Sequence, residues 1–187
     1  PNAVDARIKE DPRVTIHIDF ANNPCVGYNK NKAFHLGSGD ILVEVDHDDL
    51  LLPECLQELN IAFQDQQIGF VYSDCAVYHM TDRFVPFNSA YGWTYTTIRW
   101  KGRDLISMDS FPPTSHSMAY IWYAPDHVRA WRSDVYRDIG GHNPELSRTC
   151  CQRRDCAGRA GWLTIIPPDL NLCLLFGDVL ASENLHG

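Results

Sequence analysis

One stretch of the chain decides the fold class: Gly37-Ser38-Gly39-Asp40-Ile41-Leu42-Val43-Glu44-Val45-Asp46-His47-Asp48-Asp49. Residues 41–45 form a nearly continuous apolar run, which is typical of a strand buried on both faces of a parallel sheet. The glycines before this run predict the end of a helix over residues 29–36. The acidic cluster begins where the strand ends. The stretch therefore predicts a helix, a turn, a buried strand and a polar loop, in that order.

The flanking segments continue this alternation of strands and helices. β-branched residues predict a strand over residues 14–18. Beyond the acidic cluster, a helix is predicted from residue 52 to about residue 64, with Pro53 in its first turn, and a strand is predicted over residues 68–73. Strands alternating with helices predict an α/β domain with a parallel sheet. The second helix can build an apolar face from five residues: Leu56, Leu59, Ile61, Ala62 and Phe63.

The second half of the chain has fewer regular patterns. Residues 78–123 are rich in aromatic residues, glycine and proline, and a long irregular stretch inside a domain is usually functional. A short helix is predicted over residues 134–139, stopped by Gly140 and Gly141. One apolar strand is predicted over residues 162–166.

The composition excludes several classes of protein. The 187 residues are 44% hydrophobic and 21% charged, a balance typical of one globular domain rather than a disordered chain. The formal charge is −8, from 16 Lys and Arg against 24 Asp and Glu, so nucleic acid is not an expected partner. No apolar run approaches the roughly 18 residues that span a bilayer.

The cysteines favour a reducing, cytoplasmic setting. Their number is odd and they are scattered, whereas a disulfide framework usually has an even set in a short secreted chain. A metal cluster built from Cys150, Cys151, Cys156 and His142 is the less favoured alternative, because zinc spacings such as C-x2-C are absent from the sequence. The seven cysteines are Cys25, Cys55, Cys75, Cys150, Cys151, Cys156 and Cys173.

The chemistry is expected in the acidic cluster, where Asp46, Asp48 and Asp49 follow the buried strand. Ligands of open α/β sheets bind beyond the carboxyl ends of the strands. Two carboxylates separated by one residue can share a hard divalent cation and leave its other positions for phosphate oxygens. Such an ion neutralises charge on a leaving diphosphate. The alternative is an acidic turn in which Asp48 or Asp49 caps the next helix.

An ordered series of motifs gives the chain a family resemblance. The series comprises Gly27-Tyr28-Asn29-Lys30-Asn31-Lys32-Ala33-Phe34, Gly37-Ser38-Gly39-Asp40-Ile41-Leu42, Asp46-His47-Asp48-Asp49-Leu50-Leu51-Leu52-Pro53, Tyr72-Ser73-Asp74 and Trp131-Arg132-Ser133-Asp134-Val135-Tyr136-Arg137-Asp138-Ile139-Gly140-Gly141. Over roughly residues 8–146 it resembles family 2 glycosyltransferases with the GT-A fold. The resemblance implies a single domain, 1–187, with a mostly parallel sheet flanked by helices. Residues 8–77 would form its donor- and metal-binding part and residues 78–187 its acceptor-side part.

The resemblance also implies an activity. It is the inverting transfer of a sugar from a nucleotide-diphosphate donor, expected to be a UDP-sugar, to a glycan or lipid-linked acceptor, with Mg²⁺ or Mn²⁺ as cofactor. The implied location is the cytoplasm, at the inner face of the membrane; peripheral membrane association and a homo-oligomer stay open. Carried over by position, the donor-binding residues are Lys30, Asp46 and Asp74, the metal-binding residues Asp48 and Asp49, and the acceptor-binding residues Trp131, Gly140 and Gly141.

Several of these residues have a second interpretation. Lys30 can be a solvated surface cation, Asp74 a turn residue, and the pair Gly140-Gly141 a plain helix stop. Aromatic side chains can stack on sugar faces or lie in the core. The rings in question are those of Trp93, Tyr95, Trp100 and Trp122.

The chain departs from the family at both ends. The family's first strand, and a loop whose Asp reads the nucleotide base, are expected before Pro1, so that the domain is truncated at its N-terminus. The family's acidic pair, one member of which is the general base, falls on Cys150 and Cys151. Asp155 is the nearest acid and hence the expected catalytic residue. The family's Arg and His near the diphosphate are replaced by Leu174 and Phe176.

These departures leave a second hypothesis from another class of protein. The chain would then be a non-catalytic remnant of the fold that binds metal or carbohydrate without turnover. A metal-dependent hydrolase is a weaker third hypothesis, because no nucleophile or histidine set accompanies the acidic cluster.

Overall fold

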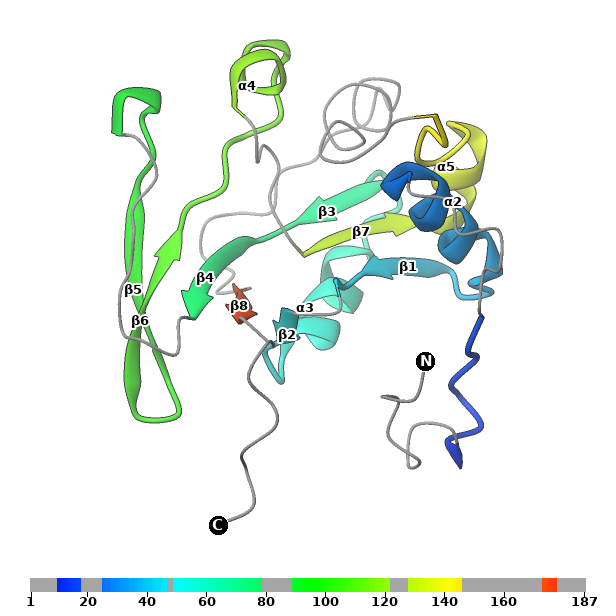
Figure 1. Cartoon of the computed structure of the whole chain (residues 1–187), viewed down its shortest axis with the longest axis horizontal. Coiled ribbons are helices and arrows are strands. Elements are labelled where there is room, and N and C mark those ends of the chain that lie inside the picture. The colour runs from blue at the N-terminus through cyan, green and yellow to red at the C-terminus, as the bar shows by residue number, and fades with distance from the viewer. Residues whose placement is uncertain are drawn as a thin grey trace.

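The computed structural model describes residues 10–17, 25–46, 49–78, 89–121, 128–145 and 173–177. Its centre is a three-stranded sheet with the order β1 (Ile41–Glu44), β7 (Arg129–Arg132), β3 (Phe70–Tyr72). Because β7 is antiparallel to both neighbours, β1 and β3 run parallel to each other. Helix α3 (Cys55–Ala62) lies between these two strands along the chain. The predicted strand, helix and parallel strand are therefore present, with a later strand inserted between them (Figure 1).

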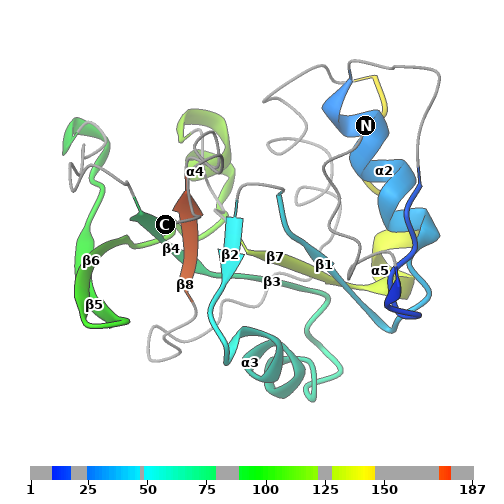
Figure 2. The same cartoon turned by 60° about the horizontal axis from the view of Figure 1, so that its bottom comes forward.

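A second sheet has five strands. Their order is β2 (Asp49–Leu51), β8 (Cys173–Gly177), β4 (Asp74–Tyr78), β6 (Arg103–Met108) and β5 (Tyr95–Trp100). Figure 2 shows β8 between β2 and β4, and the β5–β6 hairpin at the far side. The hairpin turns at Lys101 and Gly102, which both have positive φ (45° and 78°), as the twist of a two-residue hairpin requires.

The general α/β class is confirmed, but the sheets do not fit the expected mostly parallel one. Among the described strands, β4 with β8 is the only parallel hydrogen-bonded pair. The other five pairs are antiparallel. The physical reason is that late strands enter between or beside the early ones: β7 separates β1 from β3, and β6 returns along β4.

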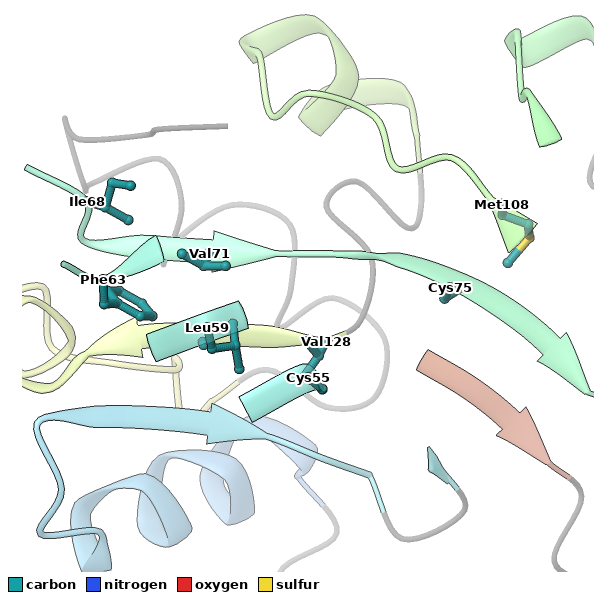
Figure 3. Close-up of a cluster of buried hydrophobic side chains, with 9 residues drawn as sticks. Cys55, Leu59, Phe63, Ile68, Val71, Cys75, Met108 and Val128 are labelled. Atoms are coloured by element: carbon teal, nitrogen blue, oxygen red, sulfur yellow. The ribbon is translucent and has the colours of Figure 1, made fainter. Parts of the chain in front are cut away.

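The three-stranded sheet is covered on both faces. On one face, Phe34 of α2 (Val26–Leu36) and Tyr136 of α5 (Ser133–Asp138) pack with Phe70 and Trp131. The other face packs against α3, and Figure 3 shows Leu59 of that helix beside Val71 and Val128. Figure 2 shows α2 and α3 on opposite sides of this sheet. This arrangement has three layers, helix, sheet and helix.

Two short elements complete the described part of the chain. They are the 3-10 helix η1 (Ser89–Tyr91) and the helix α4 (Ser115–Tyr120). No helix in the described ranges combines the length and the apolar character that crossing a bilayer demands.

Five predicted elements are confirmed with shifted ends, and they became α2, β1, α3, β3 and α5. The predicted strand over 14–18 is wrong for residues 14–17, which form no strand and leave Val14 40% and Ile16 45% exposed. The apolar face predicted for α3 is also partly wrong, since Leu56 and Ile61 are 59% and 50% exposed. The buried stripe is instead Cys55, Leu59 and Phe63. The strand predicted over 162–166 lies outside the described residues.

Candidate functional site

A cluster of charged side chains lies at the carboxyl end of β1. Lys30 of α2 forms an ion pair with Glu44, the last residue of β1, and its Nζ lies 3.2 Å from Oδ1 of Asp46. The Lys30 side chain is only 14% exposed, whereas that of Asp46 is 36% exposed. The interpretation of Lys30 as a solvated surface cation is therefore wrong. Two of the three residues predicted to bind a donor, Lys30 and Asp46, lie in contact.

Glu44 is the buried centre of this cluster. Arg129 of β7, itself buried, places Nη1 3.2 Å from Oε1 of Glu44, and His142 places Nε2 3.4 Å from Oε2. Burial by itself raises the pKa of the Glu44 carboxyl. The charges of Arg129 and Lys30 and the hydrogen bond of His142 outweigh burial and hold that pKa well below its usual range. Glu44 is therefore ionised at neutral pH although it is 4% exposed.

The loop after α5 is fixed to this cluster. The backbone N–H of His142 donates to the Tyr136 hydroxyl at 3.1 Å, and that hydroxyl lies 2.8 Å from His142 Nδ1. When the hydroxyl donates to Nδ1, the ring proton is on Nε2 and faces Glu44. From α2, Asn31 Nδ2 donates to the carbonyls of Gly140 and His142 at 3.2 and 2.7 Å. Two adjacent residues of α2 therefore make these contacts: Lys30 binds Glu44, and Asn31 binds the loop.

The prediction that Gly140 and Gly141 stop the helix is confirmed. Both have positive φ, 82° and 66°, a region that glycine enters without steric cost. Their N–H groups donate to the carbonyls of Arg137 and Tyr136 at 3.1 and 3.0 Å. A Cβ on Gly141 would lie 2.6 Å from Cε1 of Tyr136. The acceptor role that the resemblance assigns to both glycines stays a prediction.

The acidic residues after β1 take different positions. Asp49 begins β2, its N–H donates to the carbonyl of Asp46 at 3.1 Å, and its side chain is buried. Since α3 begins at Cys55 with Glu54 at its N-cap, Asp49 does not cap that helix, and this alternative is wrong for Asp49. Asp48 lies outside the described residues.

The described residues at this edge offer few ligands to a divalent cation. No three His, Cys, Asp or Glu side chains gather in the described ranges as a metal site would need. Asp46 is an accessible carboxylate at this edge, but its oxygens lie 3.2 and 3.5 Å from Lys30 Nζ. A hard cation prefers several oxygen ligands. Asp46 therefore fits such an ion only together with a further carboxylate, and the sequence offers Asp48 and the buried Asp49, whose metal-binding role stays a prediction.

Asp74 and Trp131 are held within the structure. Oδ1 of Asp74 accepts from the backbone N–H of Ser110 at 2.6 Å, and the Ser110 hydroxyl donates to the Ser73 carbonyl at 2.6 Å. Asp74 thus fixes the segment after β6. Trp131 is 3% exposed, and its ring lies 4.9 Å from Phe70 between centroids. Donor binding by Asp74 and acceptor binding by Trp131 stay predictions.

Some of the other predicted residues are partly buried, and others lie outside the described residues. Of the rings considered for sugar stacking, those of Trp93 and Tyr95 are partly buried against the main core cluster, and that of Trp100 against a smaller one. Trp122, Cys150, Cys151, Cys156 and Asp155 lie outside the described residues. The sulfur atoms of Cys25, Cys55 and Cys75 are in no disulfide within the described part of the chain. Burial raises the pKa of Cys55 to about 11.

Sequence reasoning missed the part played by Glu44 and Arg129. A charged residue inside an otherwise apolar strand was the available signal for Glu44, because an ionised side chain in a core requires a partner. Its partner Arg129 is 85 residues away in the sequence. No local pattern connects the two.

Comparison with known proteins adds no assignment to this site. No model of a protein family matches the chain, and no curated protein matches it.

Proposed function

We propose that the chain is a nucleotide-sugar transferase domain of the GT-A type, which moves a sugar from a nucleotide-diphosphate donor to a glycan or lipid-linked acceptor. The observation that carries this proposal is the contact of Lys30 with Asp46, 16 residues apart, at the carboxyl end of β1. That end of a strand is where α/β proteins bind ligands. Strands β1 and β3, which run parallel to each other on either side of β7, would belong to the sheet of the GT-A fold.

The charges at this edge support a role for a divalent cation. Lys30 and Arg129 offset Glu44 and Asp46, so these four side chains carry no net charge together. Asp48 and Asp49 follow Asp46 after one intervening residue, His47, and add negative charge. An acidic edge attracts a cation and repels a bare diphosphate.

The proposal assigns the cation to two carboxylates. Asp46 and Asp48 would hold Mg²⁺ or Mn²⁺, which when bound would neutralise charge on the departing diphosphate. Lys30 would orient Asp46 for this purpose, because its own ammonium group is anchored by the buried Glu44. We therefore expect nucleotide binding to depend on the metal.

A second candidate is a domain of the same fold that binds metal or carbohydrate without turnover. It is favoured by the state of two described acids at this edge: Glu44 is engaged by Arg129, and Asp46 by Lys30. Neither is placed to take a proton from an acceptor hydroxyl. The transferase needs Asp155 for that step. Under the first proposal, the wild-type chain releases UDP from a UDP-sugar and Asp155→Asn abolishes that release. Under the second candidate, the wild-type chain itself releases no UDP.

Calorimetric titration with UDP tests the proposal. The wild-type chain is expected to bind UDP in the presence of Mn²⁺ and to lose that binding when the metal is removed with a chelator. Asp48→Ala should weaken binding by about tenfold or more. Asp104→Ala is the matched control, because Asp104 is an exposed acid on the hairpin, paired with Arg99. Equal binding by wild type and Asp48→Ala, or no binding by wild type, would refute the proposal.

A further inference from the structure

A pocket of about 470 Å³ lies between η1 and α4, apart from the charged cluster. Pockets for small ligands usually have volumes of roughly 300–1,000 Å³. Tyr91 comes from η1, Phe111 and Pro112 from the segment after β6, and His116 and Tyr120 from α4. Figure 1 shows α4 well away from α2 and α5. The pocket is therefore a separate candidate site.

The lining of the pocket combines exposed rings with neutral polar groups. Tyr91 is 55% and Tyr120 65% exposed. The rings of His116 and Tyr120 lie 4.8 Å apart between centroids. The described residues that line the pocket include no Lys, Arg, Asp or Glu. Among these described residues, a phosphate, a nucleotide or a metal ion has no Lys, Arg, Asp or Glu partner, whereas a neutral ligand has rings and neutral hydrogen-bond groups to contact.

The walls of the pocket are held in place before any ligand binds. Thr114 caps α4 in a reciprocal pair with Ser117, whose N–H donates to Thr114 Oγ1 at 3.1 Å. Phe111 packs edge-on against Trp93, with 4.6 Å between the centroids. The residue before Phe111 is held by Asp74 through the 2.6 Å hydrogen bond of its N–H. Such preorganisation lowers the entropic cost of binding.

We propose that this pocket binds a neutral glycan through its pyranose rings; that this glycan is the acceptor of the transfer reaction rests on the proposed function. A pyranose has an apolar face of C–H groups and an edge of hydroxyl groups. The exposed Tyr91 and Tyr120 rings provide surfaces for the face, and the imidazole of His116 and the hydroxyl of Tyr91 provide hydrogen-bond groups for the edge. Asp74 then acts as a positioning residue for the pocket wall.

An array of immobilised neutral glycans, probed with the fluorescently labelled chain, tests this proposal. The wild-type chain should bind a subset of the glycans. Tyr120→Ala should weaken that binding by about tenfold, while Tyr120→Phe, which keeps the ring, should bind within about twofold of wild type. Leu56→Ala is the matched control, because Leu56 is 59% exposed on α3 and outside the pocket. Unfolding temperatures of all variants show whether each one is folded.

Three results would overturn the proposal. The first is that the wild-type chain binds none of the glycans. The second is equal weakening by Tyr120→Ala and Leu56→Ala. The third is displacement of the bound glycan by octanoate, which would identify the pocket as a site for an apolar chain.

The UDP titration, repeated on the same proteins, separates this inference from the proposed function. Glycan binding that depends on Tyr120, without any UDP binding, would overturn the transferase and leave the pocket supported. UDP binding without glycan binding would overturn the pocket alone.

Discussion

Glu44→Gln removes one negative charge from the cluster at β1 and nearly preserves the shape of the side chain. In the folded chain, Arg129 is 3% exposed and would lose its carboxylate partner at 3.2 Å. Lys30 would lose one of its two carboxylate partners. Breaking a buried ion pair by changing one partner costs about 3–5 kcal/mol, because an uncompensated charge stays buried. We expect the free energy of unfolding to fall by about this amount.

The matched control is Asp104→Asn, the same carboxylate-to-amide change at an exposed pair. Arg99 and Asp104 lie 2.7 Å apart, but their side chains are 67% and 61% exposed. Exposed pairs contribute about 0–1 kcal/mol, because water and salt screen the charges. The two substitutions should therefore differ by several-fold in their effect on stability.

Urea unfolding followed by circular dichroism measures both effects. With a slope of about 2 kcal/mol per molar urea, Glu44→Gln should lower the midpoint by about 1.5–2.5 M. Asp104→Asn should lower it by less than about 0.5 M. If Glu44→Gln does not fold, the double variant Glu44→Leu/Arg129→Met should recover stability, because it leaves no unpaired charge at these two positions. Equal midpoints for Glu44→Gln and Asp104→Asn would refute the reasoning.

The pH dependence of stability gives a second test of the same charge. The pKa of Glu44 in the folded chain lies well below its ordinary value of 4.5. A lowered folded-state pKa contributes stability that is present above pH 4.5 and is lost as the pH falls from there toward the folded pKa. The free energy of unfolding should fall more steeply below pH 4.5 in the wild type than in Glu44→Gln. Parallel curves would contradict this prediction.

Two further predictions concern the loop after α5 and the thiols. Gly141→Ala should destabilise the chain by about 2–4 kcal/mol, because the added Cβ would meet Tyr136 at 2.6 Å and φ is 66°. Gly140→Ala, with φ 82° but open space around it, should cost about 1–2 kcal/mol; equal losses of unfolding temperature would contradict this difference. Iodoacetamide at pH 8 should label the half-buried Cys25 before Cys55, which is buried and has a pKa of about 11. Peptide mass spectrometry measures the two rates, and equal rates would show that Cys55 is accessible.

Local patterns were sufficient to predict the elements that surround the candidate site. The apolar run over 41–45 became β1, and the helix predicted over 29–36 became α2 with three more residues at its start. Such elements are determined by the spacing of apolar residues and by glycine stops. The sequence therefore predicted the helix that carries Lys30 and the strand that precedes Asp46.

The strand pairings could not be read from local patterns. Nothing in residues 129–132 shows that they lie between β1 and β3, because pairing depends on partners far along the chain. The hairpin was missed although it has a signal: Lys101-Gly102 separates two stretches of strand-forming residues. The burial of Glu44 was missed for a related reason, since its partner Arg129 comes from the inserted strand.

Electron paramagnetic resonance of Mn²⁺ tests most directly whether the acidic edge beyond β1 holds a metal together with a nucleotide. The spectrum of free Mn²⁺ is lost when the ion is bound. The wild-type chain should reduce the signal of free Mn²⁺, and added UDP should reduce that signal further. The Asp48→Ala chain should leave the signal of free Mn²⁺ nearly unchanged. Equal signals with wild type and Asp48→Ala, with and without UDP, would contradict a metal site at this edge.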